Sequence, residues 1–137
     1  MDGNADYEFV EFYNPTSAAV ALTGWSVKKK TSTGNESPLI ASSRFEGKII
    51  PAGRHFLAAN EGGYSGAITA DIGWAKSNTL AYKDNAVVLY DANGGKIEEV
   101  DWSEILKGQS FRRSSLEAAV FTVSNPNPQN TSFEGAL

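Results

Sequence analysis

The chain has 137 residues, of which 41% are hydrophobic, 20% charged and 11% aromatic. This composition predicts one globular domain over residues 1–137 and excludes a disordered chain. The absence of cysteine excludes disulfides and thiolate metal sites. The net charge of −4 gives no general attraction for nucleic acid.

No segment approaches the roughly 18–20 apolar residues of a membrane span. The first residues are polar and acidic, unlike the basic and apolar start of an export signal. Because Met1 stands directly before this polar leader, we expect the chain to be a domain of a longer precursor.

The first predicted strand runs from Glu8 to Asn14 and is ended by Pro15, which cannot donate to a ladder. A second, short strand covers Val20 to Leu22. Gly24 then permits a sharp turn that carries Trp25 inward, so we expect Trp25 to be a central core anchor.

The next strand is predicted by the alternation of Trp25 and Val27 with Ser26, Lys28 and Lys30, which places the lysines on a solvated face. Residues 31–38 are rich in Thr, Ser, Gly and Asn and predict a loop. Residues 45–50 and 55–59 predict the two strands of a hairpin. Its connection, 51–53, fits a type I turn with Pro second and Gly fourth.

Residues 60–83 are irregular, with four glycines among three aromatic residues. A strand over 85–90, an Asn-Gly turn at 93–94 and a strand over 97–102 predict a second hairpin, with a bulge near Ile97. Residues 103–107 can form one helical turn. Edge strands are expected at 110–113 and 120–123, before an extended tail over 125–130.

Roughly eight short strands without a convincing helix predict an all-β, immunoglobulin-like antiparallel β-sandwich. The alternating apolar positions predict its core. These are Val10, Phe12, Leu22, Trp25, Val27, Phe56, Leu57, Val87 and Leu89.

The order of these motifs resembles the lamin tail domain family over about residues 7–102. The motifs are Glu8–Pro15, Leu22–Trp25, Pro51–Gly53, Asp84–Tyr90 and the return strand 95–101, with a Trp in the position of Trp74. Residues 103–137 add C-terminal edge strands and a tail that are similar to bacterial members.

The resemblance implies a non-catalytic interaction module of an exported or surface bacterial protein. It leaves two alternatives open: a nuclear, lamin-type tail that binds nucleic acid or chromatin, and an accessory domain of a secreted hydrolase. The sequence contains no heptad rod of the kind that precedes the tail in lamins.

Residues 63–67 are similar to the nucleophile elbow G-x-S-x-G, but position 67 is Ala and no buried strand precedes the motif. Ser65 with His55, the single histidine, is therefore a weak hydrolase candidate beside a flexible glycine loop and a surface histidine of a hairpin. We expect no enzymatic activity and no cofactor.

Two acidic groups are candidates for a cation. The segment that starts at Asp91 lacks the Gly and Glu of a calcium loop and predicts a hairpin turn instead. Acidic residues near the strand ends could also converge on an adventitious cation. These are Asp6, Glu8, Glu98, Glu99 and Asp101.

Two groups of residues are candidates for partner binding. Tyr64, Trp74 and Tyr82 suit a protein or glycan platform, with a Trp that plugs the sandwich as the structural alternative. The basic group suits phosphate contact or a solvated strand that discourages aggregation. It comprises Lys28, Lys29, Lys30, Arg44 and Lys48. We expect a protein or cell-surface partner, and we expect nucleic acid not to be one.

Overall fold

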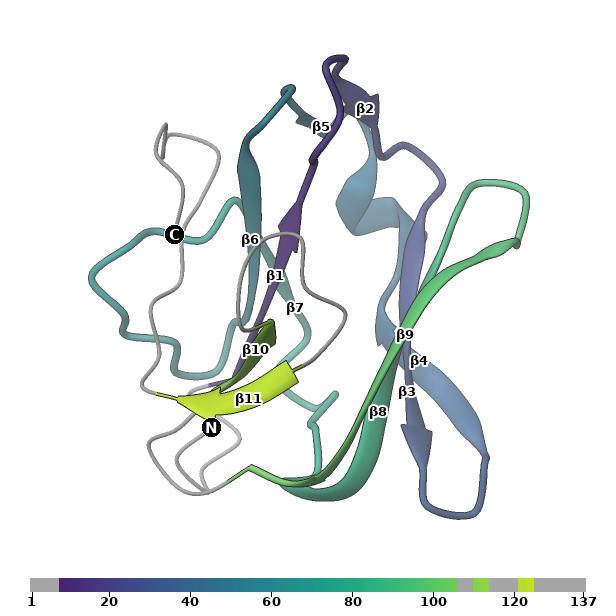
Figure 1. Cartoon of the computed structure of the whole chain (residues 1–137), viewed down its shortest axis with the longest axis vertical. Helices are drawn as coiled ribbons and strands as arrows, with labels where there is room; N and C mark the ends of the chain where they lie inside the picture. The colour runs from purple at the N-terminus through teal and green to yellow at the C-terminus, as the bar shows by residue number, and fades with distance from the viewer. Residues whose placement is uncertain (1–7, 106–109, 114–120, 125–137) are drawn as a thin grey trace.

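The computed structural model describes residues 8–105, 110–113 and 121–124. It contains two facing β-sheets (Figure 1). One has the order β1-β6-β7, formed by Phe9–Tyr13, His55–Asn60 and Ile72–Trp74. The other has the order β4-β3-β8-β9, formed by Glu36–Ile40, Ser26–Thr31, Lys83–Tyr90 and Lys96–Glu104.

Two small ladders complete the described structure. β2 (Val20–Ala21) pairs with β5 (Ile49–Ile50), and β10 (Ser110–Arg113) pairs with β11 (Phe121–Ser124). A short 3-10 helix, η2 (Ser42–Phe45), connects β4 to β5. The all-β, immunoglobulin-like architecture predicted from the sequence is confirmed. Its pairings are antiparallel except for β6 with β7, which are parallel. No helix in the described part of the chain has the length and apolarity of a membrane span.

The predicted hairpin over residues 45–59 is wrong. The strands β5 and β6 do not pair with each other, because β5 pairs with β2 and β6 pairs with β1. The turn between them is closed by the bond from Arg54 N to Pro51 O (3.1 Å), which places Gly53 third in the turn at φ +68°. The backbone N–H of Gly53 donates to Asn14 O (2.9 Å), so the turn is bonded to the residue that follows β1.

Two further segments differ from their prediction. Residues 36–40 form strand β4, although Ser37 and Pro38 are poor strand formers; β4 is an edge strand, where Pro is tolerated. Residues 42–45 form η2 in place of the start of a strand. The bulge expected near Ile97 is confirmed, because Leu89 pairs with Glu98 and Tyr90 with Lys96, which leaves Ile97 unpaired.

The expected helical turn over 103–107 is wrong where the structure describes it, because Ser103 and Glu104 end β9. The expected edge strands near 110–113 and 120–123 are present as β10 and β11. The expected tail over 125–130 lies outside the described residues.

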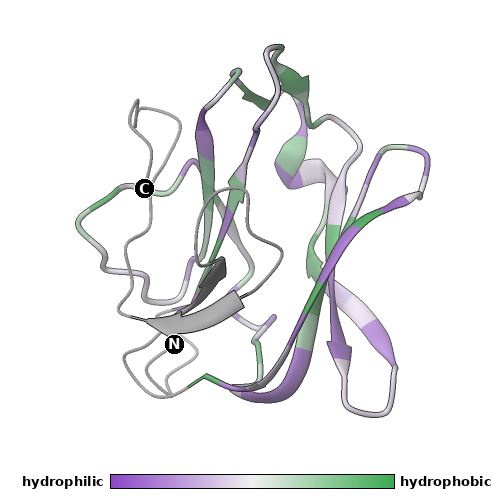
Figure 2. Cartoon of the chain, in the orientation of Figure 1, coloured by the Kyte–Doolittle hydropathy of each residue, from purple (hydrophilic) through white to green (hydrophobic). Residues whose placement is uncertain are grey.

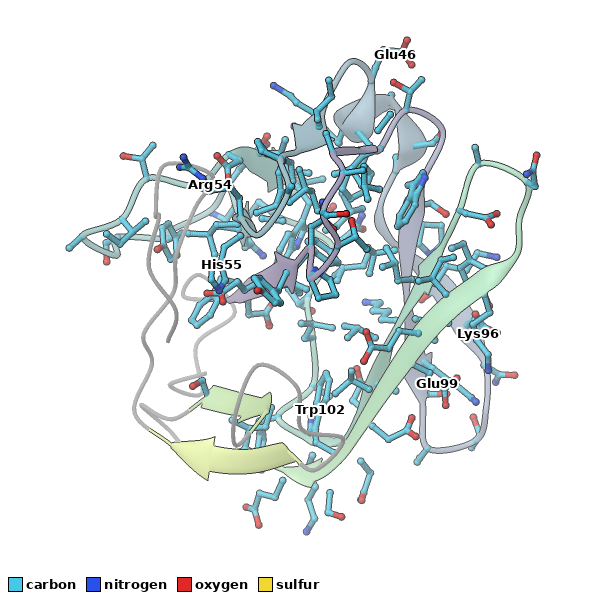
Figure 3. All side chains as sticks on the ribbon, turned by 45° about the horizontal axis from the view of Figure 1, so that its top comes forward. Glu46, Arg54, His55, Lys96, Glu99 and Trp102 are labelled. Carbon is cyan, nitrogen blue, oxygen red and sulfur yellow. The ribbon has the colours of Figure 1, made fainter. Side chains whose placement is uncertain are left out.

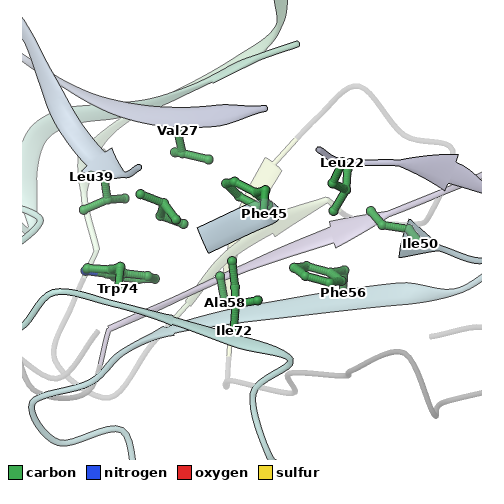
Figure 4. Packing of buried hydrophobic residues seen from close by; sticks show 10 residues of the cluster. Leu22, Val27, Leu39, Phe45, Ile50, Phe56, Ala58, Ile72 and Trp74 are labelled. Carbon is green, nitrogen blue, oxygen red and sulfur yellow. The ribbon is translucent and has the colours of Figure 1, made fainter. Parts of the chain in front are cut away.

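The core lies between the two sheets (Figure 4). Of the predicted core residues, Leu22, Val27, Phe56 and Leu57 are buried. The others are partly buried and pack against the core cluster; they are Val10, Phe12, Trp25, Val87 and Leu89.

The central aromatic anchor is Trp74 and not Trp25. The Trp74 side chain is fully buried, at 0% exposure, whereas Trp25 is half-buried. The indole N–H of Trp74 donates to the carbonyl oxygen of Asn78 (2.7 Å), so its one polar atom is satisfied inside the sandwich. The expectation for Trp25 failed because the turn at Gly24 leaves its indole at the margin of the core.

Candidate functional site

The three aromatic residues predicted as a partner platform do not share one exposed surface. Trp74 is a core residue, which is the structural alternative for this position. Tyr64 is half-buried, packs edge-on against Phe9 (ring centroids 6.3 Å apart) and donates its hydroxyl to Ile68 O (2.8 Å). Tyr82 alone is largely exposed, at 52%. The predicted platform is therefore wrong as a unit.

The predicted group of lysines on β3 is divided between the two faces of its sheet. Lys28 pairs with Val88 and Lys30 with Ala86, whereas Lys29 pairs with Val87 on the core side. Consistent with this position, the Lys29 ammonium donates to Thr79 O (2.8 Å) beneath the surface. The alternation in the sequence predicted Lys28 and Lys30 on the outer face, and the register of β3 with β8 agrees with this prediction; Lys29, which was grouped with them as a basic candidate, lies on the opposite face.

The outer lysines of β3 are engaged by neighbouring side chains. Lys28 Nζ lies 5.1 Å from the centroid of the Tyr90 ring, and Lys30 Nζ lies 3.2 Å from Glu99 Oε1. Figure 3 shows Glu99 on β9 beside Lys96, its second cationic neighbour. The lysines and the hydrogen bond from Asp101 lower the pKa of Glu99, whereas burial and the adjacent Glu99 raise the pKa of Asp101. This face is therefore a mixed-charge surface and not a basic patch.

The remaining basic candidates lie elsewhere. Arg44, on η2, forms an ion pair with Glu61. Lys48 is exposed next to β5. Neither residue belongs to the sheet that carries the lysines of β3, so the structure does not assemble the five basic residues into one site.

The weak hydrolase candidate is also not supported by the positions of its two residues. His55 is fully buried on β6, where its ring lies 4.9 Å from that of Tyr13 and its Nε2 lies 3.8 Å from Glu11 Oε1. Burial lowers the pKa of His55. Ser65 is exposed in the loop after β6. The expectation of a surface histidine is wrong.

The acidic residues at the strand ends do not form a metal site in the described part of the chain, where no group of three or more potential ligands occurs. Asp6 lies outside the described residues, and Glu8 is buried away from the β9 group. Asp91 forms the predicted hairpin turn: its carboxylate accepts from Asn93 N and Gly95 N, both at 2.9 Å.

One end of the sandwich exposes apolar side chains. We call this end the apolar tip; it comprises Ala18, Ala19, Ala21 and Ile49, around the β2–β5 ladder. Ala21 pairs with Ile49, and both are exposed, Ile49 at 52%. Figure 2 shows hydrophobic colour on β2 and β5 at this end. Contiguous exposed apolar surface is typical of an interaction site.

The apolar tip is held by one buried side chain, that of Asn14. Its Nδ2 donates to Ala18 O (2.8 Å) in the loop before β2, and to Ile50 O (3.0 Å) and Pro51 O (3.3 Å) after β5. Its Oδ1 accepts from Thr16 N (3.0 Å) and from the Thr16 hydroxyl (2.7 Å). Asn14 therefore fixes two loops that are distant in sequence, which pre-organises the surface that they carry.

A buried carboxyl group lies where the two sheets meet. Glu8, directly before β1, is 1% exposed, and its Oε1 accepts from Leu80 N (2.8 Å). Its Oε2 accepts no hydrogen bond among the described residues. Burial raises the pKa of Glu8 from 4.5 to about 7, although the bond from Leu80, the Asn60 side chain and the Lys29 ammonium act in the opposite direction.

Sequence reasoning did not find these two features. Asn14 was interpreted as the residue that ends a strand, and Ile49 as part of a strand, although the run Ala18–Ala21 is an apolar signal close to a turn. Glu8 was grouped with cation candidates because its burial depends on residues 72 positions away.

These features define a class: an immunoglobulin-like β-sandwich whose loops and ends are tied by buried polar side chains. The model of the Lamin Tail Domain family matches residues 1–104, and the chain belongs to this family. The match covers β1 to β9 and ends before β10. No curated protein matches the chain.

Proposed function

We propose that the domain is a non-catalytic interaction module that binds a protein partner through the apolar tip. The observation that supports this proposal is the exposed Ala21–Ile49 pair, held in place by Asn14. A rigid apolar surface loses little conformational entropy on binding and gains from the removal of its apolar area from water.

The charges around the apolar tip indicate the chemistry of the partner. Residues 14–22 and 46–54 contain two basic residues, Lys48 and Arg54, and one acidic residue, Glu46, whereas the whole chain has a net charge of −4. The partner surface that complements this end is apolar with acidic groups at its rim. A nucleic-acid partner is not favoured, because the lysines of β3 are divided between two faces and two of them contact Tyr90 and Glu99.

The wider context of the module is also a proposal. The similarity of residues 103–137 to bacterial members supports a place on an exported or surface protein. The exposed Ser65 and the buried His55 support the absence of hydrolase activity. Turnover of a chromogenic ester that is lost in Ser65→Ala would contradict that absence.

The chain offers a matched pair of variants for testing the apolar tip. Ile49 and Ile97 are both strand residues with nearly equal exposure, 52% and 50%, but Ile97 lies on β9. A displayed peptide library and a glycan array are screened with the wild-type domain, and hits are tested against Ile49→Asp and Ile97→Asp. We expect peptides that lose binding to Ile49→Asp by tenfold or more and keep binding to Ile97→Asp.

Three outcomes contradict the proposal. Peptides whose affinity is unchanged by Ile49→Asp, or is reduced equally by Ile49→Asp and Ile97→Asp, place the binding surface elsewhere. Glycan hits without peptide hits assign a different class of partner. The melting temperatures of both variants are measured first, so that a binding defect is separated from a folding defect.

A further inference from the structure

Residues 75–82, here called the crossing segment, lead from β7 in the three-stranded sheet to β8 in the four-stranded sheet (Figure 1). Two tryptophan side chains hold this segment, one at its middle and one near its C-terminal end. The indole N–H of Trp74 donates to Asn78 O (2.7 Å), and that of Trp102 donates to Ala81 O (3.0 Å). The environments of two indoles therefore depend on the position of the crossing segment.

The middle of the crossing segment is also held by polar hydrogen bonds on both sides. Lys29 of β3 donates to Thr79 O (2.8 Å), and the Asn78 amide donates to Leu39 O of β4 (3.2 Å). On the side of the other sheet, Glu8, directly before β1, accepts from Leu80 N (2.8 Å). The segment closes over the Glu8 carboxyl group, whose second oxygen is buried and accepts no hydrogen bond among the described residues.

We propose that the crossing segment is a pH-responsive latch, which is closed while Glu8 is protonated and opens when Glu8 becomes charged. Opening lets the carboxylate reach water, and it releases the polar ties of the crossing segment to both sheets. The proposal is independent of the function of the apolar tip.

The groups around Glu8 decide the direction of this response. Among the described residues, the charged group that faces Glu8 is Lys29 of β3; β6 contributes the neutral Asn60, and the crossing segment contributes backbone groups. Lys29 and the Leu80 amide favour the carboxylate. The loss of water around the buried group outweighs them and keeps the pKa near 7, so charge accumulates in the closed state only above that pH.

The size of the response follows from proton linkage. In the open state Glu8 is solvated and has its ordinary pKa of 4.5, whereas in the closed state its pKa is about 7. Between these values the opening equilibrium constant rises about tenfold per pH unit, and above about pH 7 it becomes constant.

The experiment measures opening at two places in the crossing segment. Hydrogen exchange of the Leu80 amide, corrected for its intrinsic rate, is followed by NMR from pH 5.5 to 8. In parallel, the emission of Trp74 and Trp102 is followed in a Trp25→Phe background, which removes the third tryptophan of the chain. We expect Leu80 protection to fall about tenfold per unit up to pH 7 and then to level off, with a matching change in emission.

Glu8→Gln is the decisive variant, because it keeps the shape and the acceptor for Leu80 N while removing the charge. Its Leu80 protection should be independent of pH, whereas the exposed control Glu46→Gln should respond like the wild type. Leu80 protection that does not change with pH in the wild type, or that changes equally in Glu8→Gln, would overturn the proposal.

A measurement on the unsubstituted protein keeps the test decisive if Glu8→Gln does not fold. The carboxyl carbon of Glu8 is titrated by NMR in the folded wild type. A midpoint near 4.5 overturns the latch, because the carboxyl group would then be solvated in the closed state; a midpoint well above 4.5, together with Leu80 protection that falls as pH rises, supports it.

Discussion

The side-chain nitrogen Nδ2 of Asn14 lies 3.0 Å from the carbonyl oxygen of Ile50. This hydrogen bond joins the end of β1 to the end of β5 across 36 positions of the chain. The same amide nitrogen also reaches Ala18 O and Pro51 O. This neutral side chain therefore joins two loops by hydrogen bonds in a chain that has no cysteine to form a disulfide.

Asn14→Asp should destabilise the domain by roughly 1–3 kcal/mol, because a carboxylate cannot donate to the three carbonyl oxygens that the amide serves. Urea unfolding measures the change. Asn35→Asp, at an exposed turn position, is the matched control and should change stability by less than about 0.5 kcal/mol. Equal effects of the two substitutions would show that Asn14 does not hold the loops.

Trp74→Ala should lower the free energy of unfolding by ~3–5 kcal/mol, because it leaves a cavity in the core and removes the donor to Asn78 O. Trp25→Ala should cost less, because that side chain is half-buried at the margin of the core cluster. Chemical denaturation of the two variants under identical conditions gives the comparison. A larger loss for Trp25→Ala would contradict the assignment of Trp74 as the anchor.

The contribution of Glu8 to the stability of the folded domain should fall as pH rises from about 4.5 to about 7. Glu8 has a higher pKa in the folded state than in the unfolded state, so the unfolded chain releases its proton first and is favoured as pH rises. A pKa that rises from 4.5 to about 7 corresponds to ~3 kcal/mol at most. The contribution is complete below pH 4.5 and is lost above pH 7.

The effect of Glu8 on stability is obtained by comparing the wild type with Glu8→Gln at each pH. This comparison is necessary because His55 acts in the opposite direction: burial lowers its pKa from 6.5, so its contribution to stability is lost as pH falls below that value. The difference in unfolding free energy between the wild type and Glu8→Gln should narrow toward low pH, because both side chains are neutral there. A difference that does not change with pH would contradict the raised pKa.

Lys29→Met should destabilise the domain more than Lys28→Met. Lys29 donates to Thr79 O and faces Glu8, so its loss leaves a carbonyl oxygen without its donor, an effect of roughly 1–3 kcal/mol. Lys28 contributes only an exposed contact with the Tyr90 ring, worth about 0.5–1 kcal/mol. Thermal and urea unfolding of both variants test the division of the lysines between two faces; a reversed order would contradict it.

The parts of the fold that sequence predicted are those set by local pattern. The alternation in residues 85–90, the Asn-Gly turn and the return strand appear as β8 and β9 because each signal is contained in a few residues. β4 was missed because Ser37 and Pro38 have low strand propensity, and its pairing with β3 overrides that preference.

The candidate sites were less predictable because they depend on contacts between distant residues. Glu8 and Leu80 meet only when both sheets are in place, and the bond from Lys29 to Thr79 O joins residues that are 50 positions apart. The exposure of Ile49 follows from its pairing with Ala21 in place of the expected hairpin. Local composition contains none of these relationships.

The pairing of β3 with β8 has a consequence for synthesis of the chain on the ribosome. Ser26 pairs with Tyr90 and Thr31 with Asn85, so the inner partner of β3 emerges more than fifty residues after β3 itself. Until then β3 has only the short strand β4 beside it, and β1 must wait for β6 in the same way. Such distant pairings predict folding in milliseconds to seconds, after most of the domain has been translated. A nascent chain that stops before β8 should therefore be protease-sensitive throughout, whereas one that extends past β9 should be resistant.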